Sequence, residues 1–260
     1  MENPTNAFKA AIAAGRTQIG LWCTLSSAYA TEISASAGVD WLMIDMEHSP
    51  SGFETVLAQL QAAAAYPVSA VVRPAWNDPV LIKQVLDIGA QTILVPFVQS
   101  AEEARRAVAA SRYPPRGIRG VSSLTRATRF GRIADLANHC ERELCILVQI
   151  ESPTALDNLE EIASVDGVDG VFIGPNDLAA GMGLVGRSSH PDVAAAVEGA
   201  LARLRAAGRA AGLLTTDEEF ARRCLGLGAC FIAVGVDIGI LARGTSELGR
   251  RFAGPAPRRV

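Results

Sequence analysis

The sequence contains few aromatic residues, little net charge and no long uninterrupted apolar run. Aromatic residues make up 5% of the 260 positions and hydrophobic residues of all kinds make up 49%, so the core must be mainly aliphatic, as in α/β proteins. A net charge of −3, spread along the chain, does not favour binding to nucleic acid or to an acidic membrane surface. No apolar run approaches the roughly 18 residues of a membrane span, and the start of the chain lacks a basic region followed by an apolar one. We therefore expect a cytoplasmic protein whose partner is a small molecule.

Cysteine and lysine, whose side chains can form disulfides, bind soft metals or form Schiff bases, are also rare. Cysteine occurs five times, at positions 23, 140, 145, 224 and 230. The number is odd, and three of the five lie inside apolar strand-like runs, which predicts free buried thiols rather than disulfides or ligands of a soft metal. The two lysines, Lys9 and Lys83, do not lie at the ends of predicted strands, which disfavours catalysis through a lysine Schiff base.

Eight apolar stretches have the pattern of strands buried on both faces, and a helical pattern follows each of them. The predicted strands span residues 18–23, 41–45, 68–73, 92–97, 145–151, 170–174, 211–215 and 230–235. The predicted helices span residues 29–37, 53–65, 79–88, 101–111, 154–163, 191–207, 217–227 and 238–250, and a short amphipathic helix over residues 6–14 precedes the first strand. This alternation predicts an α/β protein with a (β/α)₈ TIM barrel and an N-terminal capping helix.

A doubly wound open sheet would also alternate strands and helices. That fold is disfavoured because no G-x-G-x-x-G motif follows the first predicted strand. No Pro/Ser-rich linker divides the chain, so we expect one domain over residues 1–253 and a flexible C-terminal tail over residues 254–260. The longest interval between predicted elements, residues 112–143, is expected to contain a functional loop.

Polar residues at the ends of the predicted strands are the candidates for an active site, because a (β/α)₈ barrel builds its site there. Glu151 ends the strand 145–151, and Asp177 follows the strand 170–174. Two carboxylates without a partnering His or Cys suit a hard divalent cation such as Mg²⁺ or Mn²⁺. The alternative is that Glu151 marks a helix start and that Asp177 caps the turn after it.

Two further candidates follow neighbouring strands. His48 comes after the acidic run Asp45-Met46-Glu47, which makes it a candidate general base, and the alternative is an ordinary exposed histidine. Arg73 ends the strand 68–73, where its guanidinium could bind an anionic oxygen near the cation. The alternative for Arg73 is an ion pair with a strand-end carboxylate such as Asp45.

Several motifs give the chain a specific resemblance to a known family. They are Asp45-x-Glu47-His48-x-Pro50, Val72-Arg73-Pro74, residues 81–90, Leu94-Val95-Pro96, Tyr113-Pro114-Pro115-x-Gly117-x-Arg119-Gly120, Gln149-Ile150-Glu151 and Gly174-Pro175-x-Asp177-Leu178. With these motifs the chain resembles the HpcH/HpaI family of metal-dependent pyruvate aldolases over nearly its whole length. The resemblance implies a class II aldolase that cleaves 4-hydroxy-2-oxo acids to pyruvate and an aldehyde.

The resemblance assigns roles to the residues that would bind metal and substrate. Glu151 and Asp177 would be ligands of a divalent metal, which could be Mg²⁺, Mn²⁺ or Co²⁺. Arg73 would bind the pyruvyl oxygen, and Gln149 would lie beside a water molecule of the metal.

For the remaining motif residues the resemblance implies supporting roles. His48 would be the base, and Asp45 and Asp87 would orient it. Arg126, which by itself is expected to be a solvated loop residue, would reach the substrate site of a neighbouring subunit. The implied assembly is a homohexamer in which paired subunits exchange their last helices.

Two other functions remain open. The same barrel could be a related enolate-forming lyase that acts on acyl-CoA thioesters, although no extension suited to CoA is evident in the sequence. It could also bind a 2-oxo acid without turning it over, although the complete set of Arg73, His48, Glu151 and Asp177 disfavours an inactive site.

Overall fold

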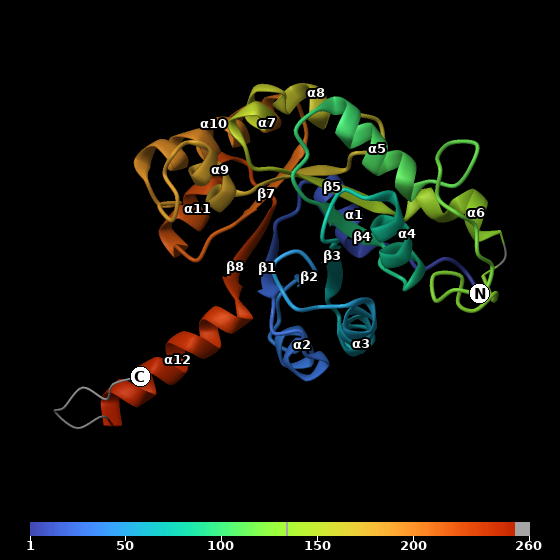
Figure 1. Cartoon of the computed structure of the whole chain (residues 1–260), viewed down its shortest axis with the longest axis horizontal. Helices are drawn as coiled ribbons and strands as arrows, with labels where there is room; N and C mark the ends of the chain where they lie inside the picture. Colours follow the sequence, from blue (N-terminus) through green and yellow to red (C-terminus); the bar gives the residue numbers. More distant parts are fainter. Residues whose placement is uncertain (134, 253–260) are drawn as a thin grey trace.

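The computed structural model describes residues 1–133 and 135–252, and within them eight parallel strands form a closed barrel (Figure 1). The strands are β1 (Gln18–Cys23), β2 (Trp41–Asp45), β3 (Ser69–Arg73), β4 (Thr92–Val95), β5 (Cys145–Ile150), β6 (Gly170–Ile173), β7 (Ala210–Leu214) and β8 (Phe231–Val236). Each strand pairs with the next along the chain, and β8 pairs with β1 to close the sheet. The predicted (β/α)₈ barrel is confirmed.

Helices surround the barrel and connect its strands. They are α1 (Ala7–Ala13), α2 (Ala28–Ala35), α3 (Phe53–Ala63), α4 (Pro79–Asp87), α5 (Ala101–Ser111), α6 (Leu136–His139), α7 (Pro153–Asp157), α8 (Leu159–Ala163), α9 (Pro175–Gly181), α10 (Pro191–Ala206), α11 (Glu218–Leu227) and α12 (Asp237–Phe252), with a 3₁₀ turn at Cys140–Arg142. The predicted helix 154–163 is divided at Asn158 into α7 and α8, because Asn158 has a non-helical ψ of 14°. The segment after β6 forms the helix α9 rather than a turn, so Asp177 lies in a first helical turn.

The interior of the barrel holds a cluster of large aromatic rings. Trp41, Phe172 and Phe231 are buried there in one cluster, and Phe8 of α1 packs against them with ring centroids 5.7 Å from both Trp41 and Phe231. Fully burying one such side chain contributes roughly 1.5–3 kcal/mol. The helix α1 therefore closes the amino end of the barrel as the predicted capping helix.

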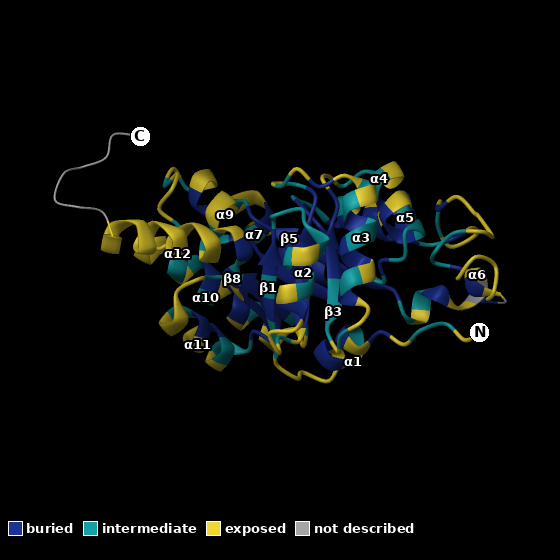
Figure 2. Ribbon diagram, turned by 90° about the horizontal axis from the view of Figure 1, so that it is seen from below, coloured by how far each residue is buried: buried dark blue, intermediate teal, exposed yellow. Residues whose placement is uncertain are grey.

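A second, aliphatic layer lies between the strands and the surrounding helices, and Figure 2 shows it as buried residues beneath an exposed outer surface. All five cysteines are buried free thiols, as predicted. Among the described residues, no helix has the combination of length and apolar character that a membrane crossing requires.

The last helix, α12, does not cover its own barrel. Figure 1 shows that it projects away from the end of β8 toward the C-terminus. Asp237 is its one buried residue, and that carboxylate accepts hydrogen bonds from Thr24 and Leu25 at the start of the first βα loop. The predicted helix 238–250 is thus formed, and the predicted tail 254–260 lies outside the described residues.

Candidate active site

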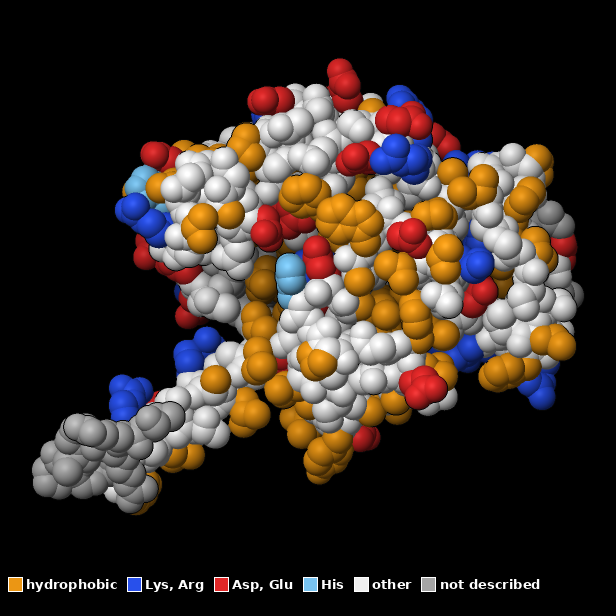
Figure 3. Space-filling view, in the orientation of Figure 1, with side chains coloured by type: hydrophobic (Ala, Val, Ile, Leu, Met, Phe, Trp, Pro, Cys, Tyr) orange, Lys and Arg blue, Asp and Glu red, His pale blue; other side chains and the backbone are white. Residues whose placement is uncertain are grey.

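The carboxyl ends of β2, β3, β5 and β6 bring the predicted site residues to one end of the barrel. Asp45 and Arg73 are directly opposite each other in the β2–β3 register, and Ile150 is opposite Ile173 in the β5–β6 register. Glu151 follows β5 at once, and Asp177 lies in the first turn of the helix after β6. Figure 3 shows acidic side chains and a histidine gathered around a hollow on the face of the molecule seen there.

Arg73 is held by two carboxylates and one aromatic ring. Its Nε and Nη2 donate to the two oxygens of Asp45 at 2.8 and 2.7 Å, and its Nη1 lies 2.7 Å from Oε2 of Glu47. Its Cζ lies 4.9 Å from the ring centroid of Trp22, whose Nε1 donates to Asp45 at 3.2 Å. The ion pair weighed for Arg73 therefore exists, but a guanidinium has more N–H groups than these contacts use, so it can still bind an anionic oxygen.

This ion pair is buried. Asp45 is 0% exposed and Arg73 is 5% exposed. Burial alone would raise the pKa of Asp45, but the hydrogen bonds and charge of Arg73 outweigh it and hold that pKa below its ordinary value. The ion pair therefore favours the ionised form of Asp45, and its two hydrogen bonds orient the guanidinium plane of Arg73.

Glu151 is a buried carboxylate in an unfavourable electrostatic environment. It is 3% exposed, its Oε1 accepts from the backbone N–H of Phe97 at 2.8 Å, and its Oε2 accepts from Nε2 of Gln149. Burial, followed by the negative charges of Glu47 and Asp177, raises the pKa of Glu151 to about 7. A cation bound by Glu151 would counter that shift, because a positive charge favours the ionised carboxylate.

The residues present fit a divalent metal. Glu151 and Asp177 offer hard oxygen ligands, and Oε1 of Gln149 is a buried acceptor that has no hydrogen-bond partner in the described residues. The described residues contain no group of three or more His, Cys, Asp or Glu side chains arranged around one metal position. Two carboxylates with water and substrate oxygens are nevertheless the usual ligand set for Mg²⁺ and similar ions.

His48 lies at the same end of the barrel, and its supporting contacts differ from those predicted. Its side chain is 65% exposed, and its Nε2 lies 4.0 Å from Oε1 of Glu47. Asp45 is bound to Arg73, and Asp87 accepts from Nη2 of Arg119 at 2.7 Å, so in the described chain neither aspartate pairs with His48. Asp87 is the last residue of α4, and because that helix runs back along the barrel, its end lies far from the carboxyl ends of the strands.

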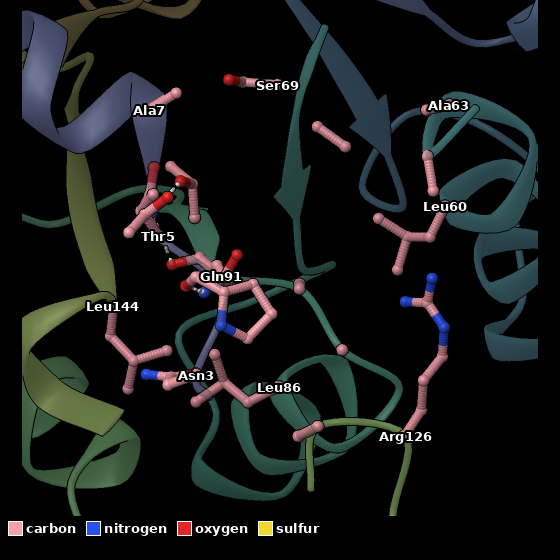
Figure 4. A pocket seen from close by; sticks show the side chains of 18 of the residues that line it. Asn3, Thr5, Ala7, Leu60, Ala63, Ser69, Leu86, Gln91, Arg126 and Leu144 are labelled. Carbon is pink, nitrogen blue, oxygen red and sulfur yellow. Dashed lines mark hydrogen bonds between the residues drawn. The ribbon is translucent and has the colours of Figure 1, made fainter. Parts of the chain in front are cut away.

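Arg126, which was predicted to reach the site of a neighbouring subunit, lies away from the site of its own chain. Its Nη1 donates to the carbonyl of Ile88 at 3.0 Å, and its side chain lines a cavity of about 440 Å³ (Figure 4). Ser69 and Thr92, the first residues of β3 and β4, line the same cavity, which puts it at the amino end of the barrel. Within one chain, therefore, Arg126 does not join Glu151 and Arg73.

The family model described as HpcH/HpaI aldolase/citrate lyase matches residues 18–243. The chain belongs to the HpcH/HpaI family. It is 62% identical over 253 residues to a pyruvate aldolase of Rhizobium etli, covering 97% of this chain and 100% of that protein. It is 58% identical over 248 residues to a 4-hydroxy-2-oxo-heptane-1,7-dioate aldolase of Salmonella dublin, covering 95% and 94%. Its fold matches the crystal structure of an HpcH/HpaI aldolase/citrate lyase family protein from Burkholderia cenocepacia with a TM-score of 0.91 at 38% identity, covering 95% and 99%.

Three residues of this HpcH/HpaI protein enter the site without having been assigned a role from the sequence. Glu47 contacts Arg73 and lies beside His48, Trp22 packs on Arg73, and the backbone of Phe97 holds Glu151. Glu47 could have been found, because it is two residues after Asp45 near the end of the same strand. Nothing in the sequence marks a backbone N–H such as that of Phe97.

At Gly174 the backbone lies so close to the side chains of Glu151 and Gln149 that there is no room for a Cβ. A Cβ there would lie 2.7 Å from Oε2 of Glu151 and 3.0 Å from Nε2 of Gln149, and its φ of −97° is one that any residue can adopt. The Gly174→Ala substitution is therefore expected to act by displacing the side chains of Glu151 and Gln149, without backbone strain, and to lower metal affinity by about 10–100-fold. Titration with Mn²⁺ measures this, and Gly199→Ala in α10, where a Cβ has no neighbour within 4 Å, is the matched control. Unchanged affinity in Gly174→Ala would contradict the placement of Glu151 in the metal site.

Proposed function

We propose that this protein is a metal-dependent pyruvate aldolase that reversibly cleaves 4-hydroxy-2-oxo acids to pyruvate and an aldehyde through a pyruvate enolate. The observation that carries the proposal is the Arg73 fork, fixed by Asp45 and Glu47, at the same end of the barrel as the carboxylates of Glu151 and Asp177. The names of the relatives from Rhizobium etli and Salmonella dublin support the reaction class.

Glu151 and Asp177 would hold the cation, and Gln149 would accept a hydrogen bond from a water molecule beside it. When bound, a divalent cation supplies Lewis-acid stabilisation to the 2-oxo oxygen of the substrate. Oxygen ligands discriminate weakly among Mg²⁺, Mn²⁺ and Co²⁺, so the proposal covers all three.

The chain's own residues account for the movement of charge. His48 takes the proton of the 4-hydroxyl group, the C3–C4 bond breaks, and C4 leaves as the carbonyl carbon of the aldehyde. The bonding electrons pass to C3 and the 2-oxo group, and the unused N–H groups of Arg73 donate to the oxygen that becomes negative. C3 then takes up one proton, which balances the proton that His48 removed from the 4-hydroxyl group, and pyruvate is complete.

The raised pKa of Glu151 predicts how metal binding depends on pH. Below pH about 7 the free enzyme carries a proton on Glu151 that the cation must displace, whereas above about 7 it does not. The apparent Kd for Mn²⁺ should therefore rise by about tenfold per pH unit below pH 7 and level off above pH 8. Calorimetry in two buffers of different ionisation enthalpy counts the protons released, and the expected result is about one at pH 6 and almost none at pH 8. A Kd independent of pH between 6 and 8 would contradict this assignment.

His48 is expected to act on the bond-breaking step and not on metal binding. The His48→Ala variant should cleave a 4-hydroxy-2-oxo acid about 10²–10⁴-fold more slowly than the wild type, because a positioned general base contributes that much. Its Mn²⁺ affinity should be unchanged. A wild-type cleavage rate in this variant would remove His48 from the role of base.

Exchange of the methyl protons of pyruvate in D₂O separates the proposed function from its two alternatives. An aldolase should exchange these protons in the presence of the cation without any aldehyde, whereas a barrel that only binds 2-oxo acids should not. A lyase specific for acyl-CoA thioesters should fail to cleave a free 4-hydroxy-2-oxo acid. Nuclear magnetic resonance follows the exchange, and its absence in the metal-loaded wild type would refute the proposal.

We also propose a homo-oligomer, with a hexamer as the implied form, in which α12 packs on a neighbouring copy. The apolar side chains that α12 exposes are Ile238, Ile240, Leu241, Leu248 and Phe252, at 49–84%. Such a row on a helix that leaves its own barrel supports helix exchange, and an assembly would allow the loop of Arg126 to approach a neighbour's site. Light scattering should give a hexamer for the full chain and a smaller species for residues 1–236. A monomeric full chain would contradict the proposal.

A further inference from the structure

The backbone that follows β4 makes two consecutive contacts, one with the residue that follows β5 and one with β5 itself. The N–H of Phe97 donates to Oε1 of Glu151 at 2.8 Å, and the N–H of Val98 donates to the carbonyl of Gln149 at 3.1 Å. In an extended strand, successive N–H groups point to opposite sides, so they cannot both face the same neighbour. The left-handed conformation of Phe97, with φ of 52°, turns the chain so that both donors face β5.

This conformation is unusual for a phenylalanine. A positive φ is a genuine outlier for a bulky residue, whereas glycine adopts it at no steric cost. The chain therefore places a ring at a position where the backbone conformation alone would favour glycine. The ring must contribute a contact that offsets the strain.

The contact is a stacked pair of aromatic rings. The centroids of Phe97 and Trp76 are 5.7 Å apart with an interplanar angle of 27°. Trp76 belongs to the β3–α4 loop, three residues after Arg73, and it is 52% exposed. The stack thus connects the loop that holds Glu151 to the loop that follows Arg73.

We propose that the Trp76–Phe97 stack positions Glu151 for the divalent cation. The stack keeps Phe97 in its left-handed conformation, that conformation directs the Phe97 N–H at Oε1, and the hydrogen bond fixes the carboxylate plane. Removing a group that orients a metal ligand, without touching the metal itself, typically lowers metal affinity by about 10–100-fold. The inference deepens the proposed function and rests on it, because it requires Glu151 to bind the metal.

Titration of the full chain with Mn²⁺, followed by electron paramagnetic resonance, tests the proposal directly. Trp76→Ala should weaken Mn²⁺ binding by about tenfold or more, whereas Trp76→Phe, which retains a ring for stacking, should stay close to wild type. Phe97→Ala should also weaken binding, because nothing then holds a non-glycine residue at positive φ. Phe97→Gly should lose less affinity than Phe97→Ala, because glycine adopts this φ without the ring.

Phe130→Ala is the matched control. Phe130 is another phenylalanine with positive φ, 58°, and it is 61% exposed, but its N–H donates to the carbonyl of Thr125. Mn²⁺ affinity should be unchanged in this variant. Circular dichroism in the presence of a chelator checks that each variant is folded, and the comparison of Phe97→Gly with Phe97→Ala remains decisive if Trp76→Ala does not fold.

The possible outcomes separate this proposal from the proposed function. Loss of Mn²⁺ binding in Glu151→Gln together with wild-type binding in Trp76→Ala would overturn the positioning role and leave the metal site intact. A variant with unchanged Mn²⁺ affinity and only a raised KM for the aldehyde would likewise overturn it, because the stack would then be a wall of the substrate pocket. Failure of the wild type to bind Mn²⁺ would overturn both.

Discussion

The Glu151→Gln variant is expected to lose metal-dependent pyruvate release almost completely, by about 10³-fold or more, because each 1.36 kcal/mol of lost transition-state stabilisation is tenfold in rate and Lewis-acid stabilisation supplies several kcal/mol. Glutamine has nearly the same shape and keeps an oxygen that can accept from the N–H of Phe97. It removes the charge that a divalent cation requires and one of the two acceptor oxygens, the one that accepts from Nε2 of Gln149. The wild-type and variant rates are compared at saturating metal and substrate.

Measuring the stability of Glu151→Gln shows whether the variant is inactive because it lacks a metal ligand or because it is misfolded. Burial and the charges of Glu47 and Asp177 raise the pKa of Glu151 to about 7, so ionisation of Glu151 lowers the free energy of unfolding of the metal-free protein, and this cost is fully present above pH 7. Glu151→Gln should therefore be at least as stable as the wild type in a chelator at pH 8. Glu102→Gln, on an exposed side chain, is the control for removing a carboxylate. An inactive variant with a markedly lower melting temperature in chelator would indicate a structural role instead.

The second large effect is expected at Arg73. The Arg73→Ala variant should lose about 10²–10³-fold in kcat while it retains its Mn²⁺ affinity, because a charged donor to the developing oxyanion is worth that much. It should also be less stable by roughly 3–5 kcal/mol, since Asp45 would be left buried without its partner. Steady-state kinetics and chemical denaturation measure the two losses separately.

Conservative variants distinguish the two roles of Arg73. Arg73→Lys keeps a positive charge for Asp45 but loses the planar fork, so it should recover most of the stability and little of the activity. A double variant with Asp45→Asn should recover stability without activity, because it removes the unpaired charge. An Arg73→Ala enzyme that turns over like the wild type and only unfolds more easily would reduce Arg73 to an ion-pair partner.

Much of this site could be predicted because its position depends on topology. Once eight strands alternate with helices, the carboxyl ends of all the strands lie at one end of the barrel, and residues at or just after those ends, such as Arg73, Glu151 and Asp177, are brought together there. The strand limits were less accurate. The predicted strand 92–97 ends at Val95, and Phe97 lies beyond it at a positive φ that its side chain does not predict.

The contacts of Asp87 and Arg126 depend on the direction of a helix and the path of a loop, which the hydrophobic periodicity of the sequence does not encode. Asp87 was expected near His48, but the direction of α4 carries it to the other end of the barrel, where it pairs with Arg119. Arg126 lies in the long interval before β5, and its position depends on the path of that loop and on whichever copy of the chain lies next to it. Glu47 belongs to one of the motifs of the resemblance and to the acidic run before His48, but neither feature predicts its contact with Arg73.

The central claim is that the carboxylates at the ends of β5 and β6 bind a cation that is needed for carbon–carbon bond cleavage. Release of pyruvate from a 4-hydroxy-2-oxo acid, coupled to lactate dehydrogenase, tests it most directly. The wild type freed of metal by a chelator should be inactive and should recover its rate when Mg²⁺, Mn²⁺ or Co²⁺ is restored, while Glu151→Gln should stay inactive under both conditions. Pyruvate release that persists in the exhaustively chelated wild type, or in Glu151→Gln, would contradict the claim.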